Sequence, residues 1–168
     1  MNDGTCFRAR RDRDLTVCAR VLRDVHHADR YPVNWPDDPE GWLRGADTMG
    51  AWVGCRDERV VGHVLLARPA SGDVAPTLVP SDTSVAVVGR LFVAPSARGH
   101  RLGAALLERA AREACLRGAL AVLDVVTTDR AAIALYERLG WRFLGEGQQR
   151  WGPGTSVTVR CYSAPSEG

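Results

Sequence analysis

A short loop in the middle of the chain carries residues whose types and spacing suit a bound phosphate. It reads RGHRLG from Arg98 to Gly103, between a β-branched and aromatic segment and an amphipathic stretch of helical periodicity. The first N–H groups of a helix have no intrahelical acceptor, and the helix dipole adds partial positive charge there. A phosphate satisfies both, glycine lets the backbone approach it closely, and Arg98 and Arg101 can add charge-assisted hydrogen bonds. The loop therefore suits a pyrophosphate.

Two familiar nucleotide motifs do not describe this loop. It lacks the Lys-Ser/Thr ending of a Walker loop, and its glycines do not fall at G-x-G-x-x-G spacing. Neither an NTPase nor a Rossmann oxidoreductase is predicted. An ordinary strand-to-helix turn with solvent-facing arginines is the alternative interpretation of the same residues.

Two segments in sequence order resemble the GCN5-related N-acetyltransferase (GNAT) superfamily. RLFVAP at 90–95, followed by Arg98–Gly103, is similar to the family's strand and its loop Gln/Arg-x-x-Gly-x-Gly/Ala. Arg101 departs from that pattern, because a glycine is usual there, and it must take a helical or N-terminal-turn geometry that tolerates a side chain. LDVVTTDRAAIALYERLGW at 123–141 is similar to the family's later strand and helix. Two motifs in the right order are far more specific than either alone.

The resemblance implies an α/β fold of the α+β type, the GNAT fold. Its mixed central sheet has six to seven strands flanked by about four helices, and the central strand splays from its parallel neighbour. The implied cofactor is acetyl-CoA, whose pantetheine arm would enter that gap and bond to the backbone like an added strand. The residues implied to bind the cofactor are Leu91, Phe92, Val93, Arg98, Gly99, His100, Arg101, Leu102, Gly103, Ala104 and Asp129.

Hydrophobic periodicity and turn residues predict the elements that position this loop. Strands are expected over 5–11, 48–56, 59–68, 84–94, 120–126, 141–150 and 155–162, and helices over 12–27, 39–45, 101–117 and 129–140. Asp129 is expected to cap the last helix. The loop over 69–84 is long for a hairpin connection, which indicates a mobile or functional segment.

Length and composition narrow the class of protein. A chain of 168 residues predicts one domain over 1–168, with a disordered tail over 163–168. A formal charge of +2 with scattered arginines suggests neither nucleic acid nor a membrane as partner. The five cysteines are odd in number and never spaced C-x-x-C, so we expect neither disulfides nor a metal site, but reduced core residues in a cytoplasmic protein. Either a monomer or a homodimer fits.

Tyr136 matches the tyrosine that the resembled family uses as general acid. A free phenol titrates near about 10 and a thiol near about 8.5, so the hydroxyl can stabilise a departing thiolate by hydrogen bonding as much as by full proton transfer. The alternative for Tyr136 is packing, because Ile133 and Leu139 share its helical face. Asp129 stands where the family usually has asparagine, and its main expected role is capping.

The acceptor site and the general base are less defined. The resemblance places the acceptor near the segment between the first two helices, where Tyr31, Trp35 and Trp42 would line a pocket or else pack the helices onto the sheet. His63 lies in an apolar strand and is either a hydrogen-bonded core residue or part of the acceptor site. The strand glutamate that many relatives carry as base is absent. A water chain or one of four side chains would replace it: His63, His26, Asp82 or Glu40.

The predicted function is acetyl-CoA-dependent N-acetyl transfer to a primary amine, by direct attack through a tetrahedral intermediate. The acceptor is expected to be a small, amino-acid-like molecule. Two alternatives remain open: acetylation of a protein N-terminus or lysine, and a non-catalytic acyl-CoA sensor.

Overall fold

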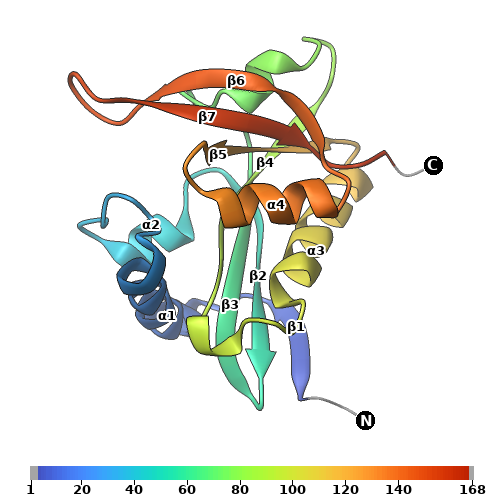
Figure 1. Ribbon diagram of the computed structural model, residues 1–168. Helices are drawn as coiled ribbons and strands as arrows, with labels where there is room; N and C mark the ends of the chain where they lie inside the picture. Colours follow the sequence, from blue (N-terminus) through green and yellow to red (C-terminus); the bar gives the residue numbers. More distant parts are fainter. Residues whose placement is uncertain (1–3, 167–168) are drawn as a thin grey trace. The chain divides into compact units, whose positions relative to one another are not determined.

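The computed structural model describes residues 4–166, whose contacts divide the chain into two compact units. Unit 1 comprises residues 4–67 and 90–110, and unit 2 comprises 68–89 and 111–166. The described residues form seven strands and four α-helices, with three short 3-10 turns (η1–η3), as the predicted fold class requires (Figure 1). In chain order the elements are β1 (Thr5–Ala9), η1 (Asp12–Asp14), α1 (Leu15–Asp29), α2 (Pro39–Arg44), β2 (Thr48–Arg56), β3 (Arg59–Ala67), η2 (Ala75–Leu78), β4 (Val85–Val93), η3 (Pro95–Ala97), α3 (Leu102–Leu116), β5 (Leu120–Val126), α4 (Arg130–Arg138), β6 (Arg142–Arg150) and β7 (Ser156–Ser163).

Unit 1 is built on the antiparallel strands β1, β2 and β3, followed by the C-terminal part of β4. Alternate residues of β2 point to opposite faces of this sheet. Val53 and Cys55 join the core cluster that includes Leu15, Cys18 and Leu22 of α1. In Figure 1, α1 and α2 lie side by side next to β3.

The other face of β2 and β3 receives the first half of α3. A Cβ on Gly62 would lie 3.0 Å from a methyl carbon of Leu106, and one on Gly54 would lie 3.6 Å from the same carbon. These two glycines therefore let α3 approach the sheet closely. The guanidinium group of Arg109 on α3 lies 4.9 Å from the ring centroid of Trp52 on the same face.

The β2–β3 hairpin turns at Asp57-Glu58, as predicted. Both residues have positive φ, 49° and 66°. Such a pair is the signature of a two-residue type I′ turn, which usually carries Asn-Gly. The turn type was not evident from the sequence because Glu58 stands where a type I′ turn usually has glycine.

Unit 2 contains a parallel strand pair, formed by β4 and β5. Their pairing covers three residues of each strand, Val85–Val87 with Leu120–Val122. Strand β5 continues to Val126 and pairs with β7, which in turn pairs with β6, both antiparallel. The short pairing of β4 with β5 is what a splayed central strand predicts.

The loop over 69–84 is anchored within unit 2 by one carboxylate. Asp124 on β5 accepts hydrogen bonds from the N–H groups of Val74 at 2.8 Å and Ala75 at 2.7 Å, where η2 begins. Ala75 is fully buried in the core cluster with Val122 and Cys161. The loop therefore has a fixed structural attachment at its centre.

The end of the chain differs from the predicted tail. Ser163 is the last residue of β7, and the N–H of Ala164 donates to the carbonyl oxygen of Ala121 at 2.8 Å. Residues 167 and 168 of that predicted tail lie outside the described residues. Within 4–166, none of the helices combines the length and apolar character needed to cross a membrane.

Candidate active site

The loop between η3 and α3 has the backbone geometry of an anion-binding helix start. Gly99 and Arg101 both have left-handed φ, 88° and 59°. A Cβ on Gly99 would meet nothing within 4 Å, so the space beside it is open. The first hydrogen bond of the helix runs from the Ala105 N–H to the Arg101 carbonyl at 3.0 Å. The N–H groups of Leu102, Gly103 and Ala104 precede it and have no intrahelical acceptor.

The backbone of Arg101 differs from the helical or N-terminal-turn geometry expected from the sequence. Its backbone is left-handed, neither helical nor an ordinary N-terminal turn. This geometry costs a residue with a side chain roughly 1–2 kcal/mol more than glycine. The loop thus keeps the conformation that a glycine would supply, and adds an exposed cationic side chain to it.

Arg98 makes a contact that the sequence did not predict. Its Nη2 atom donates to a carboxylate oxygen of Asp29, the last residue of α1, and lies 3.4 Å from the carbonyl oxygen of Val93. Both side chains of the pair remain almost half exposed, 45% for Arg98 and 43% for Asp29. Asp29 therefore partly neutralises the charge of Arg98 when no anion is bound.

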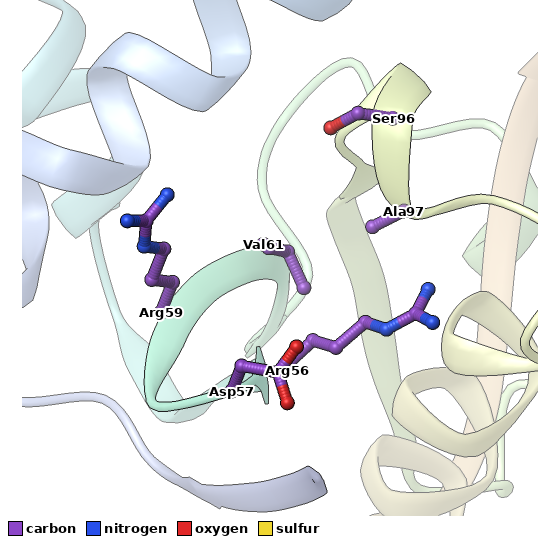
Figure 2. A pocket seen from close by; sticks show the side chains of 6 residues that line it. All are labelled: Arg56, Asp57, Arg59, Val61, Ser96 and Ala97. Atoms are coloured by element: carbon purple, nitrogen blue, oxygen red, sulfur yellow. The ribbon is translucent and has the colours of Figure 1, made fainter. Parts of the chain in front are cut away.

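A hollow of about 600 Å³ opens between η3 and the β2–β3 hairpin (Figure 2). Ser96 and Ala97 of η3 line it together with Val61 and the hairpin residues Arg56, Asp57 and Arg59. Figure 2 shows Arg56 and Arg59 extending to opposite sides of the hairpin end. Because its lining includes two arginines and one aspartate, the hollow carries net positive charge.

Tyr136 lies on α4 in unit 2. The helix is capped as predicted, because Oδ1 of Asp129 accepts a hydrogen bond from the Ala132 N–H at 3.1 Å. The Tyr136 side chain is 8% exposed. Its ring centroid lies 6.1 Å from that of Trp141 and 5.9 Å from that of Tyr162. The Tyr136 ring is therefore packed between two aromatic neighbours of the same unit.

His63 is fully buried, and both of its ring nitrogens have partners. Nδ1 lies 2.8 Å from the carbonyl oxygen of Arg90, which requires Nδ1 to donate, and Nε2 then accepts from Nη1 of Arg10 at 3.0 Å. The ring stacks on Phe92. Burial lowers the pKa of His63 to about 4, and the charges of Arg10 and Arg90 act in the same direction. This neutral imidazole has no free lone pair.

The three aromatic residues of the acceptor prediction all contact the core of unit 1. Tyr31, Trp35 and Trp42 are partly buried and pack against the cluster that holds α1 on the sheet. The rings of Tyr31 and Trp42 meet edge to face, with centroids 6.3 Å apart. Packing is thus an established role for all three, and their partial exposure leaves apolar surface for a ligand.

The chain matches a known protein family over a segment that contains this loop and α3. Residues 19–141 match the acetyltransferase (GNAT) family, which is most of the chain. The chain belongs to the acetyltransferase (GNAT) family. It is therefore an acetyl-CoA-dependent N-acetyltransferase by family, as its sequence motifs predicted.

Solved structures of acetyltransferases share the fold. The ribosomal-protein-S18-alanine N-acetyltransferase from Escherichia coli has a TM-score of 0.68 at 19% identity, over 96% of this chain and 93% of that one. Arabidopsis thaliana NAA60 in complex with acetyl-CoA has a TM-score of 0.71 at 17% identity, over 95% and 98% of the two chains. Ribosomal-protein-alanine N-acetyltransferase from Brucella melitensis has a TM-score of 0.69 at 20% identity, over 96% and 99%. At these identities the likeness shows the fold alone.

The loop of this acetyltransferase fits the pyrophosphate of acetyl-CoA. Its first-turn N–H groups, the open space at Gly99 and the cationic Arg98 and Arg101 are what a diphosphate requires. When bound, acetyl-CoA supplies a thioester-activated acetyl group. The residues predicted to bind the cofactor belong to unit 1, namely Leu91, Phe92, Val93 and Arg98–Ala104, except for Asp129, which belongs to unit 2. Tyr136, the predicted catalytic residue, also belongs to unit 2.

The predicted bases of the acetyltransferase lie in different surroundings. His26 uses Nδ1 at 2.7 Å from the carbonyl oxygen of Pro32, and its ring lies 5.2 Å from that of Trp35. Glu40 accepts a hydrogen bond from the Thr16 hydroxyl at 3.0 Å. Asp82 is exposed and belongs to unit 2. Since His63 has no free lone pair, none of these groups stands out as a positioned base.

Sequence reasoning gave no role of its own to Arg90, whose carbonyl oxygen accepts the hydrogen bond from His63 Nδ1. It was assigned only to the strand motif, although it is the single charged side chain in the segment VAVVGRLFV. A lone charge within an apolar strand is a usable signal, because a strand covered on both faces has no solvent to receive it.

Proposed function

We propose that this acetyltransferase moves an acetyl group from acetyl-CoA to the primary amine of a small molecule, by direct transfer. The observation that supports it most is the left-handed entry into α3 at Gly99 and Arg101, which leaves the first-turn N–H groups available to a pyrophosphate. The small-molecule part of the proposal rests on the exposed apolar surface of Tyr31, Trp35 and Trp42. We place the enzyme in the cytoplasm. Its cysteines are free, but the expectation that all are core residues was wrong for two of them: Cys18, Cys55 and Cys161 are buried, whereas Cys6 and Cys115 are exposed.

The chain's own groups divide the work of the reaction. Backbone groups of Leu91, Phe92 and Val93 would orient the pantetheine arm, and a backbone N–H of this segment would stabilise the developing oxyanion. The Tyr136 hydroxyl would donate a proton or a hydrogen bond to the leaving sulfur. Water would remove the proton of the acceptor amine, because His63 is already hydrogen-bonded at both nitrogens.

Binding and turnover test the proposal separately. Calorimetry should show heat on titration with acetyl-CoA, and a thiol reagent should report amine-dependent release of free coenzyme. If acetyl-CoA binds but none of the tested amines or peptides causes release of free coenzyme, the protein is not an enzyme under these conditions, and a sensor is favoured. Preference for peptide N-termini or peptide lysines over every small amine would contradict a small-molecule acceptor.

A pair of glycine variants tests the loop itself. Gly99→Val places a β-branched residue at φ 88°, a conformation that such residues rarely adopt, and should weaken acetyl-CoA binding about tenfold or more. Gly72→Val is the matched control, because Gly72 has φ 99° and open space within 4 Å but lies in the loop of unit 2. Equal losses in the two variants would show that the effect is general strain rather than a lost pyrophosphate site.

A further inference from the structure

Arg90 is held rigidly at a break in strand β4. Its φ of 50° interrupts the extended backbone between Val88 and Phe92. The His63 ring donates to its carbonyl oxygen at 2.8 Å, and its guanidinium carbon lies 4.5 Å from the ring centroid of Trp42 on α2. Backbone and side chain are therefore both fixed without the help of a carboxylate.

The charge of Arg90 has no anionic partner in the part of the chain that the structure describes. Its Nε atom is buried and makes no hydrogen bond there. The residue as a whole is half-buried, so a ligand can reach part of the side chain. A buried donor without a partner costs roughly 1–3 kcal/mol in proteins generally, so a fold that retains one has reason to use the group.

A second cation lies on the far side of His63. Arg10 donates through Nη1 to the carbonyl oxygen of Leu43 at 2.6 Å and lies 3.0 Å from His63 Nε2. Burial lowers the pKa of Arg10, and the charge of Arg44 acts in the same direction. The histidine between the two arginines is neutral and adds no charge, and the charges of Asp12 and Asp14 partly offset that of Arg10, so the positive charge available to an anion is that of Arg90.

We propose that Arg90 binds an oxyanion of the acceptor, so that the acceptor is an amine carrying a carboxylate or similar group, as an amino acid does. This inference rests on the proposed acetyl transfer and names its substrate class. A guanidinium group stacked on an aromatic ring still offers the edge of its plane to a bidentate oxyanion. Arg90 directly precedes Leu91–Val93, the backbone proposed to hold the pantetheine arm, so an anion there would bring the neighbouring amine to the same strand.

The experiment compares matched acceptors on the full chain with acetyl-CoA. Each amino acid is paired with its amide and with the decarboxylated amine, and an aminophosphonate distinguishes a carboxylate from other oxyanions. The wild-type protein should favour the anionic member by about 10- to 100-fold in kcat/KM, the range expected for hydrogen bonds to a charged group. Arg90→Met should remove this preference by raising KM for the acids, and Arg90→Lys should restore part of it.

Two controls separate recognition from loss of structure. Arg13→Met removes an exposed arginine of the same unit and should leave the preference unchanged. Acetyl-CoA binding by calorimetry should be the same in Arg90→Met and the wild type. A wild-type protein that acetylates neutral amines as well as acids, or an Arg90→Met variant that keeps the preference, would overturn the inference and leave the proposed acetyl transfer standing. No transfer to any amine would overturn both.

Discussion

Arg98 donates a hydrogen bond to the carboxylate of Asp29, 69 positions away in the chain. Arg98 belongs to the loop that fits a pyrophosphate, whereas Asp29 ends helix α1. A phosphate that recruits Arg98 must compete with this carboxylate. If Arg98 binds the pyrophosphate as proposed, the exposed ion pair would weaken cofactor binding by a small amount rather than strengthen it.

Asp29→Asn should tighten acetyl-CoA binding by up to about fivefold, because the neutral amide releases Arg98 for the phosphate and an exposed pair is worth at most about 1 kcal/mol. Calorimetry at two salt concentrations measures the effect. Arg98→Ala should weaken binding, and Asp29→Asn should have no effect in that background. A gain of affinity that persists without Arg98 would show that Asp29 acts by general charge repulsion.

Tyr136→Phe should lower amine-dependent release of coenzyme thiol by about 10²-fold or more, which is the usual contribution of a general acid. The ring packing with Trp141 and Tyr162 remains in the variant, so its unfolding midpoint should stay close to that of the wild type. Steady-state kinetics over a pH series provide the measurement. Unchanged turnover would remove Tyr136 from the mechanism.

His63 should make stability depend on pH in the acidic range. Its pKa is lowered to about 4 in the fold, below the ordinary value of 6.5, so the unfolded chain takes up the proton first as pH falls. The His63 contribution is fully present above about pH 6.5 and is lost between there and pH 4, by roughly 3 kcal/mol in the free energy of unfolding. Urea unfolding at several pH values checks this.

Two histidine variants complete that measurement. His63→Gln should flatten the dependence on pH, whereas His27→Gln, at an exposed position of α1, should leave it unchanged. Equal slopes in the wild type and His63→Gln would mean that other groups cause the loss of stability in acid.

Asp124→Ala should destabilise the protein by roughly 1–3 kcal/mol, because it leaves the N–H groups of Val74 and Ala75 without their acceptor next to a buried alanine. Chemical unfolding measures the loss. Asp82→Ala, at an exposed position of the same loop, should change stability by less than about 0.5 kcal/mol. Similar losses in both variants would argue against a specific anchor at Asp124.

The features that the sequence predicted correctly are local ones. The start of α3 after a glycine-containing loop, the Asp129 cap of α4 and the hairpin at Asp57-Glu58 each depend on residues within a few positions of one another. Hydrophobic periodicity and capping act over that same range, which explains why they were sufficient. The family followed from two such local motifs in order.

Only the tertiary structure decided how distant charges and rings meet. The pairing of Arg98 with Asp29, the stacking of Arg90 on Trp42 and the engagement of both His63 nitrogens join residues from separate elements. Their consequences are a shared charge at Arg98, an Arg90 Nε atom without a hydrogen-bond partner among residues 4–166, and a pKa of about 4 for His63. These arise from burial and distance, which the order of residues does not contain. The sequence thus determined the family and predicted a cofactor loop, and packing decided which side chains remain available for chemistry.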